Sequence, residues 1–547
     1  MTEVHDPAGQ TKQRVRSTAP DEVDVAIVGA GLGGLTAGAM LARHGLRVAV
    51  FDGHYVAGGC CTMFSRGSGD RRFVFDIGLH YIGDCGPEGR IPTLLRAAGA
   101  DDVTFAAMDP DGYDTVMIPG HAFRIPVGHA RYRARLVEAF PSERKGIDRY
   151  VRLLEEVDRL EASMRKGKQG ALSLMKDVLL HGRLAAQYQG ATIGAFLDTC
   201  TRDPDLRAIM LGQGGDYGVR PSRVSAMLHC GLANHYFRGA YYPRGGGQGI
   251  ADSLARAIER SGGGVHLRRR VERIVVDNGR AAGVQVREHR GELRTVRARR
   301  VISNADIRRT FEELVGPEHL PSEMRAKVAR YEMAGAIFMT CLGVKGDLRD
   351  LGMGASNVWE FDSNDPEAIY DAVERGDATP RCSYITSASL KDPTSQHAPD
   401  GHMTLEIMTL SPGEARHWGV SDDGARGTAY RRDATYADRK LRVEDALIER
   451  AEKRFPGLAS RIVMRESATP VTQTRYTEAM AGSGYGLAAT PEQFMKNRPG
   501  YRTPVAGLYV CGASTRAGHG VLGAMSSGWN AAFRVAKELA VALPPLG

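Results

Sequence analysis

Glycines near the N-terminus are spaced so that the backbone could bind a phosphate group. Residues 29–34 have the spacing G-x-G-x-x-G. In such a motif the first glycine permits a tight turn, the second lets the backbone approach a pyrophosphate, and the third lets a helix pack closely on a sheet. The free N–H groups at the start of that helix then face the phosphates. The motif consists of Gly29, Ala30, Gly31, Leu32, Gly33 and Gly34.

An acidic residue follows at the distance that a dinucleotide site requires. Asp52 lies 18 residues beyond Gly34, where a carboxylate can accept hydrogen bonds from ribose hydroxyls. The alternative is a glycine-rich turn that binds no ligand. A strand before the motif, a helix after it and the acid behind it favour binding.

The elements around the motif predict a Rossmann-type unit. Residues 24–28 (DVAIV) and 46–51 (LRVAVF) are short apolar runs typical of buried parallel strands. Residues 35–44 have a helical composition and end at Gly45. Together they form a βαβ unit, so we expect an α/β fold.

Two further glycine-rich segments distinguish a flavin site from a nicotinamide site. Gly58 and Gly59 follow Asp52 closely, and residues 507–532 read as a late strand, glycine-rich turn and helix. The ribityl chain and isoalloxazine ring of FAD reach further than a nicotinamide and need these extra backbone contacts. We therefore predict one FAD per chain, held without a covalent bond, because no His or Cys lies in a recognised flavin-linking motif.

No second dinucleotide site is expected. Residues 245–247 and 262–264 are glycine-rich, but neither follows a buried strand and opens a helix with the right spacing. The electron donor is unknown: electrons would come from a partner, or from a nicotinamide that visits the flavin transiently.

The length of 547 residues suggests more than one domain. We expect a Rossmann-type FAD-binding domain of the GR2-like kind, built from residues 21–95, 244–310 and 500–547. It is interrupted by an α+β substrate domain, built from residues 96–243 and 311–499. Residues 1–20 are polar and read as a disordered leader.

Composition excludes several classes of function. The net charge of +8 could suit an anionic partner, but over this length a solvated basic surface is favoured, and we predict no nucleic-acid partner. The eight cysteines are sparse and lack C-x-x-C spacing, which favours a reducing cytoplasm and no metal site. The longest apolar stretch, residues 334–344, is too short to span a bilayer.

Other stretches identify a branch of flavoproteins. Residues 58–61 read GGCC, residues 75–83 FDIGLHYIG and residues 242–246 YPRGG. With these marks the chain resembles the phytoene desaturase-like flavoprotein superfamily, and within it the retinol saturase and carotenoid isomerase branch. The likeness extends from about residue 24 to residue 532.

This resemblance implies roles for particular residues. Gly29, Gly31 and Gly34 would hold the pyrophosphate and Asp52 the ribose, while Gly58 and Gly59 would lie along the ribityl chain and flavin edge. Val271 would lie in the strand that contacts adenine, and Gly512 and Met525 would contact the pyrophosphate–ribityl region and the flavin. Many relatives carry Arg directly after the Gly-Gly pair, where this chain has Cys60. The predicted cofactor-binding set also includes Ala30, Gly33, Cys60 and Ala513.

His80 and Tyr81 are candidate catalytic residues. Histidine is a common proton donor near neutral pH. The alternative is that the pair packs beside the flavin while water supplies the proton. Tyr485 and His519 are weaker candidates. Cys60 and Cys61 could be redox-active, although packing near the cofactor is favoured because the sequence shows no setting that lowers a thiol pKa.

The resemblance implies an FAD-dependent oxidoreductase that acts on C=C bonds of a long hydrophobic polyene: a retinoid, carotenoid or other isoprenoid or lipid. Carotenoid desaturation and cis–trans isomerisation remain alternatives. A non-catalytic FAD-dependent lipid-binding protein is an alternative of another class.

A water-insoluble polyene must leave a bilayer to reach the site, so we expect peripheral contact with a membrane. Residues 170–184 are the candidate docking helix. Leu172, Met175, Val178 and Leu179 would form an apolar stripe there, with basic residues nearby. The alternative is an amphipathic helix that covers the core of the second domain.

Overall fold

The computed structural model describes residues 19–165, 178, 182–288 and 291–544. Most of the predicted leader and of the docking segment 170–184 lies outside the described residues. The last part of the leader differs from the prediction, because Ala19 is buried against the core and its N–H donates to Glu288.

The first sheet is built around the phosphate motif. Its strand order is β10-β2-β1-β13-β12-β11, with β19 paired to β13. Strands β10, β2, β1, β13 and β19 run parallel to their neighbours, while β11 and β12 form an antiparallel meander with β13. The strands are β1 (Glu22–Val28), β2 (Val48–Phe51), β10 (Gly264–His266), β11 (Arg270–Asp277), β12 (Arg280–Arg287), β13 (Leu293–Ser303) and β19 (Leu508–Val510). The predicted Rossmann-type class is confirmed.

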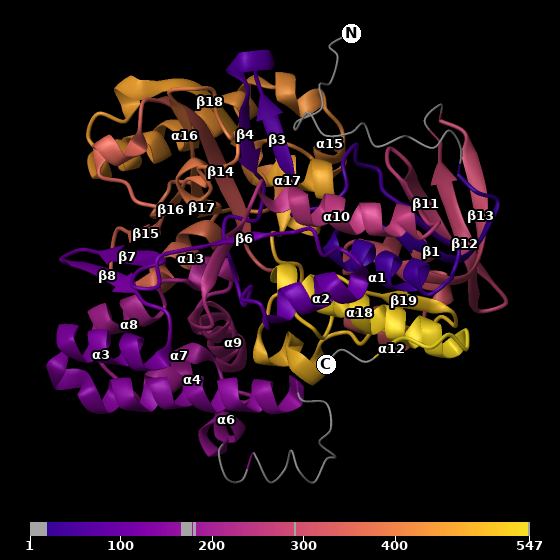
Figure 1. The fold of residues 1–547 in the computed structure, drawn as a ribbon, viewed down its shortest axis with the longest axis horizontal. Coiled ribbons are helices and arrows are strands. Elements are labelled where there is room, and N and C mark those ends of the chain that lie inside the picture. Colours follow the sequence, from indigo (N-terminus) through magenta and orange to yellow (C-terminus); the bar gives the residue numbers. More distant parts are fainter. Residues whose placement is uncertain (1–18, 166–177, 179–181, 289–290, 545–547) are drawn as a thin grey trace.

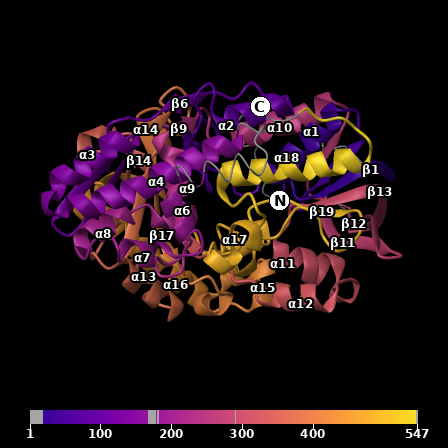
Figure 2. The same ribbon diagram turned by 90° about the horizontal axis from the view of Figure 1, so that it is seen from below.

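Helices α1 (Leu32–Arg43), α2 (Arg90–Ala98), α10 (Gly247–Arg260) and α18 (Gly520–Glu538) pack together beside this sheet (Figure 1). Figure 2 shows α18 running next to α1, although the two are almost 500 residues apart in the chain. A Cβ atom at Gly528 of α18 would collide with the carbonyl oxygen of Gly33 in α1. Glycine therefore permits the close crossing that brings the C-terminal segment to the phosphate motif.

The second sheet has the order β18-β14-β17-β16-β15-β7-β8. It is antiparallel except where β15 runs parallel to β7. Helices α3 (His129–Ala139), α4 (Arg144–Arg165) and α9 (Ala226–Phe237) form a helical layer at one end of it (Figure 1). The strands are β7 (Asp114–Ile118), β8 (His121–Ile125), β14 (Ala336–Lys345), β15 (Asn357–Phe361), β16 (Cys382–Thr386), β17 (His402–Ser411) and β18 (Ile462–Ala468).

Two of the predicted domain boundaries fall inside helical segments. The break at residue 95 lies within α2, whose residues Ile91, Leu94 and Ala98 are buried in the same core as α1. The break at residue 310 lies in the helical segment Thr310–Val315, which packs on β11. Each predicted break thus divides one helical segment, and the domain bounds stay a prediction.

Within the described ranges, no helix is both long and apolar enough to cross a membrane.

Candidate functional site

Two glycine loops meet at the start of α1. Gly29, at the end of β1, has a φ of +93°, a backbone conformation that side chains rarely adopt. Gly31 is the N-cap of α1, and no side chain caps the helix there. Gly31 also forms a bridge with Gly58, and a Cβ atom at Gly59 would lie 3.2 Å from the Gly31 Cα. The first N–H groups of α1 are thus available to an anion in a cradle that only small residues can form.

Asn304, directly after β13, completes this glycine cradle. A Cβ atom at Gly31 would lie 2.7 Å from Asn304 Nδ2, and one at Gly33 would collide with Asn304 Oδ1. A Cβ atom at Gly512 would lie 3.0 Å from the same oxygen. One amide side chain therefore lies against both the first and the last glycine-rich segment. Asn304 was not among the predicted site residues.

Asp52 lies at the end of β2, where it is positioned by backbone donors. Its Oδ2 accepts a hydrogen bond from Ala30 N at 2.7 Å, and its Oδ1 accepts one from His54 N at 2.7 Å. These bonds leave other lone pairs of the carboxylate for ligand hydroxyls. Val271 of β11 lines the same cavity.

The cradle opens into a cavity of about 1280 Å³, which is ample for a dinucleotide. Uncapped helix N–H groups, a carboxylate and glycine walls are the groups that a pyrophosphate and a ribose require, so the residues present fit FAD. Most of the predicted set lines this cavity: Gly29, Gly31, Gly33, Asp52, Gly58, Gly59, Cys60, Val271, Gly512 and Ala513.

Three predicted residues stand apart from the cavity wall. Ala30 is fully buried and contributes its N–H to Asp52. Gly34 faces the Gly29 carbonyl oxygen, with which a Cβ atom would collide, so it serves the turn. Met525 is fully buried in the core beneath α1 and lines neither cavity. This face of α18 packs inward, and the predicted contact of Met525 with the flavin stays a prediction.

A second cavity, of about 720 Å³, adjoins the first. Its walls are mainly apolar and aromatic, as is usual for sites that bind hydrophobic ligands. They come from α4, α9 and the second sheet, and include Leu160, Met227, Leu232, Ile337, Trp359 and Tyr384. The residues that line both cavities include Cys60, Gly78, Met339, Ala468, Gln473 and Tyr485.

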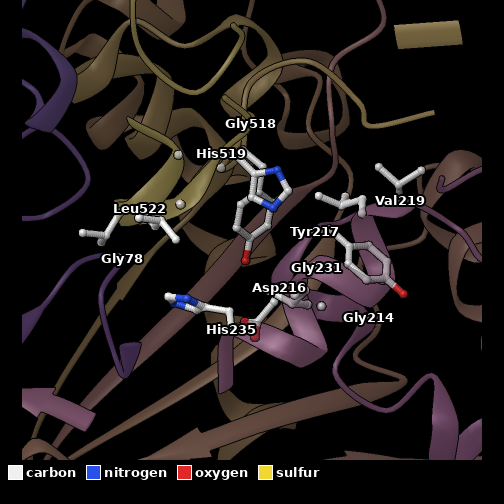
Figure 3. A pocket seen from close by; sticks show the side chains of 18 of the residues that line it. Gly78, Gly214, Asp216, Tyr217, Val219, Gly231, His235, Gly518, His519 and Leu522 are labelled. Carbon is white, nitrogen blue, oxygen red and sulfur yellow. The ribbon is translucent and has the colours of Figure 1, made fainter. Parts of the chain in front are cut away.

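The carboxyl group of Asp216 lies in this mainly apolar wall. Figure 3 shows it beside His519 and His235, which reach the same cavity from other segments. Asp216 Oδ2 accepts a hydrogen bond from Tyr81 OH at 2.6 Å and another from Tyr236 OH at 3.3 Å. The two tyrosine rings are stacked, with centroids 4.3 Å apart. Asp216 was not among the predicted site residues.

Tyr81 connects Asp216 to a second carboxyl group. Its hydroxyl lies 3.1 Å from Asp114 Oδ2. Asp114 is fully buried and also accepts from Asn357 at 2.7 Å, Gln213 at 2.8 Å and Trp359 at 3.0 Å. Burial raises the pKa of Asp114, and the hydrogen bonds from these donors oppose that shift.

Burial raises the pKa of Asp216 to about 7, and the nearby Asp114 carboxylate acts in the same direction. The hydrogen bonds from the two tyrosines oppose this shift. A carboxyl group at the wall of an apolar cavity is thus poised to hold or release a proton near neutral pH.

His80 lies on the same cavity, but its environment argues against the predicted role of proton donor. Burial, together with the Lys391 ammonium, lowers the pKa of His80 to about 3. Among the described residues its Nε2 has no hydrogen-bond partner. The ring is therefore neutral near pH 7 and has no imidazolium proton to give.

We expect His80→Gln to keep turnover of a polyene within about threefold of the wild type and to leave its pH dependence unchanged, because the neutral ring transfers no proton. Single-turnover rates between pH 6 and pH 9 test this. His80→Phe, which also keeps the volume but has no polar atom, should behave alike. Loss of an ionisation from the pH profile of either variant would contradict the expectation.

The weaker candidates also lie at this cavity. The rings of His519 and Tyr485 are 5.1 Å apart, and burial lowers the pKa of His519 to about 3. Burial raises the pKa of both Cys60 and Cys61, so neither is a reactive thiolate. Cys60 Sγ accepts a hydrogen bond from Gln473 at 3.2 Å. These settings favour packing over redox chemistry for the cysteine pair.

The chain is similar to known flavin-dependent proteins over most of its length. The family described as flavin containing amine oxidoreductase matches residues 32–536. All-trans-retinol 13,14-reductase of Danio rerio is 28% identical over 517 residues, which cover 91% of this chain and 83% of the relative. Prolycopene isomerase of Daucus carota is 26% identical over 537 residues, covering 95% and 80%. A Danio rerio protein named inactive all-trans-retinol 13,14-reductase is 25% identical, covering 92% and 84%.

Solved structures show the same fold. An oxidoreductase from Methanosarcina mazei has a TM-score of 0.60 and 19% identity, covering 92% of this chain and 99% of the other. Putrescine oxidase with bound putrescine has a TM-score of 0.59 and 18% identity, covering 95% and 99%.

Proposed function

The chain belongs to the flavin-containing amine oxidoreductase family, and from this premise we propose that it reduces a carbon–carbon double bond of a long hydrophobic polyene. As a member of this family it is an FAD-dependent oxidoreductase. The polyene would be a retinoid, a carotenoid or another isoprenoid. The observation that carries the proposal is an apolar cavity, next to the cofactor cradle, with the Asp216 carboxyl group at its wall as a proton donor near neutral pH.

The relatives support a polyene rather than an amine as substrate. The retinol reductase and the prolycopene isomerase match most of this chain. The wall of the apolar cavity suits such a molecule, because Leu160, Met227 and Trp359 offer hydrophobic contact along its length.

In the proposed mechanism FAD, when bound and reduced, supplies a hydride to one carbon of the double bond. The residues of the chain orient the substrate, exclude water and supply the proton. The apolar walls orient the polyene and exclude water, so that the reacting carbons stay close to the edge shared by the two cavities. Asp216 holds the proton that the second carbon requires, and Tyr81 and Tyr236 fix its carboxyl group at the wall.

Tyr81 also stabilises Asp216 after proton transfer. The Tyr81 hydroxyl lies within hydrogen-bond distance of both carboxyl groups. Once Asp216 has given its proton to the substrate, the hydroxyl donates a hydrogen bond to the new carboxylate. A proton from solvent then restores the acid before the next turnover.

Desaturation and isomerisation remain the alternative reactions within this proposal. Desaturation removes two hydrogens and would use Asp216 as a base, whereas isomerisation leaves the number of hydrogens unchanged. The inactive relative in Danio rerio keeps open the alternative of a non-catalytic lipid-binding protein.

An anaerobic half-reaction tests the function. Purified protein reduced with one equivalent of dithionite is mixed with all-trans-retinol or a carotenoid, and the flavin absorbance is followed. We expect reoxidation in step with loss of one double bond, measured by mass spectrometry. Reoxidation with no change in mass would indicate a leak to oxygen, and a changed isomer with the flavin still reduced would indicate isomerisation. Neither reoxidation nor isomerisation with any polyene would support the lipid-binding alternative.

The proposed substrate also supports contact with a membrane. We propose that residues 170–184, most of which lie outside the described residues, dock on anionic lipid. Leu172→Ser/Leu179→Ser should weaken flotation with anionic liposomes at least tenfold, because two leucines lose about 1.5–3 kcal/mol of burial each. The matched control is Leu293→Ser/Val463→Ser, which removes two exposed apolar side chains elsewhere. Equal flotation of both double variants would contradict docking, and unfolding of the first would support a core helix.

A further inference from the structure

The cavity that contains the glycine cradle continues beyond it, toward the second domain. This extension, here called the basic arm, lies between β3 (Met63–Arg66), the segment Ala429–Arg432 and α17 (Pro470–Thr477). Figure 1 shows β3 and α17 side by side above the first sheet. The arm is defined by Tyr55, Arg66, Arg268, Arg431, Arg475 and Tyr476.

The basic arm carries positive charge that the protein does not neutralise. Among the residues that the structure describes, Arg268, Arg431 and Arg475 form no ion pair with a carboxylate. The Arg475 Nε atom is buried and has no hydrogen-bond partner within the described chain. Arg66 pairs with Glu466 at 2.9 Å, but Lys440 shares that same carboxylate at 3.0 Å. Arg268 and Arg431 are exposed and Arg475 is partly buried, so all three guanidinium groups are accessible to an anionic ligand in the arm.

The positions of two of these arginines are set by local structure. Arg268 has a φ of +55°, a strained conformation for a residue with a side chain, and its N–H donates to the His54 carbonyl at 2.8 Å. Such strain gathers at functional sites, where the surrounding structure enforces it. Arg431 donates to Tyr476 OH at 2.9 Å and lies over the Tyr476 ring.

Exposed aromatic rings lie among these charges. Tyr55 and Tyr476 are 37% and 41% exposed, although both line a cavity. His54 stacks on Tyr55 at 4.4 Å and meets the Tyr476 ring edge-on at 5.3 Å. Flat rings beside unpaired guanidinium groups are suited to a ligand with both phosphates and heteroaromatic rings.

The basic arm leads to the edge that the two cavities share. Gln473 lies one turn before Tyr476 on α17 and lines both cavities, as do Cys60 and Ala468. The apolar cavity reaches the same edge through different walls. A charged molecule could thus approach the flavin without crossing the space of the polyene.

We propose that the basic arm is the docking site of a reduced nicotinamide dinucleotide, the electron donor of the enzyme. This inference rests on the proposed function. The C–H bond of the dihydronicotinamide breaks, and its hydride passes to the flavin. The nicotinamide leaves as the oxidised cation, and the flavin takes one proton from solvent. Two electrons are transferred, as reduction of one double bond requires.

The basic arm is suited to a nucleotide that binds and leaves in each turnover, rather than to a second tightly bound dinucleotide. The basic arm contains no strand–glycine turn–helix motif of the kind that binds a resident dinucleotide. Its affinity for a nucleotide therefore depends on the charges of its side chains. A concave arm fits a small molecule better than a protein surface. The dissociation constant should lie between about 1 µM and 1 mM, and it should rise with salt.

The experiment uses holoenzyme under anaerobic conditions. NADPH and NADH are titrated in, and the flavin absorbance reports reduction while calorimetry with the oxidised nucleotides reports binding. We expect NADPH or NADH to bleach the flavin of the wild type. Arg268→Gln/Arg431→Gln should weaken binding about tenfold and keep one FAD per chain. The matched control, Arg273→Gln/Arg432→Gln, removes two cations that line neither cavity and should behave as wild type.

Several outcomes would overturn the proposal. The first is that dithionite bleaches the flavin and neither NADPH nor NADH does, and the second is that the double variant binds nucleotide like the wild type. Loss of FAD from the double variant would assign these arginines to the resident cofactor, and reduction by an iron–sulfur or flavodoxin protein alone would assign the arm to a protein donor. Reoxidation of dithionite-reduced enzyme by a polyene is unaffected by any of these, so it tests the proposed function separately.

Discussion

Replacing Gly31 by valine should yield a folded protein that purifies without yellow colour. A Cβ atom at this position would lie 2.7 Å from Asn304 Nδ2, and the two methyl groups of valine would extend further into the cradle. Displacing Asn304 would in turn disturb Gly33 and Gly512, which it also touches. Overpacking of this kind costs about 1–3 kcal/mol before any contact with the pyrophosphate is lost.

We therefore expect FAD affinity to fall at least 100-fold. The measurement is the ratio of flavin absorbance to protein absorbance after purification, with acid precipitation to show that bound flavin is released into the supernatant. Circular dichroism shows whether the variant is folded. Gly190→Val is the matched control, because Gly190 lies in a loop with no heavy atom within 4 Å of the added Cβ. A folded Gly31→Val protein with one FAD per chain would show that the cofactor lies elsewhere.

Most of the residues predicted to bind the cofactor line one cavity, because the pattern that pointed to them is local. The turn after β1, the acid after β2 and the Gly-Gly pair lie within residues 29–59, and each has a spacing that follows from one βαβ unit. The late segment around Gly512 was found for the same reason. Asn304 was missed because a single polar residue after a strand has no pattern of its own. Asn304 reaches the glycine turns only because β13 pairs with both β1 and β19 in the folded sheet.

The proton site could not be predicted from the sequence for a related reason. Tyr81 lies 33 residues from Asp114 and 135 from Asp216, so their hydrogen bonds exist only once the two sheets have formed. The FDIGLHYIG stretch pointed to His80 and Tyr81 together. Their roles differ in the structure. Burial keeps the His80 ring neutral, whereas the Tyr81 hydroxyl lies between two carboxyl groups.

The sequence also does not show which face of a helix is buried or where a domain ends. Met525 follows a glycine-rich turn, but whether its side chain faces the cavity depends on how α18 is rotated against α1. The boundary inside α2 has the same origin, since its apolar residues show which core they join only in three dimensions.

Replacing Asp216 by asparagine should reduce the rate at which a polyene reoxidises the reduced flavin by at least 100-fold, the usual contribution of a general acid. The amide keeps the shape of the side chain and still accepts hydrogen bonds from Tyr81 and Tyr236, so the fold and FAD content should be unchanged. Asp198→Asn is the matched control, because Asp198 lies on the surface in an ion pair with Arg207. Equal rates for Asp216→Asn and the wild type would exclude Asp216 as the proton donor.

The pH dependence of the same rate distinguishes proton transfer from a structural role. The pKa of Asp216 is about 7, so the protonated donor is present below that pH, and the wild-type rate should fall as pH rises through it. Asp216→Asn should lose this ionisation. Tyr81→Phe removes a hydrogen bond that lowers the pKa of Asp216, so the fall in rate should move to higher pH. If Asp216 only supported the cavity wall, all three proteins would share one pH profile, as the wild type and Asp198→Asn should.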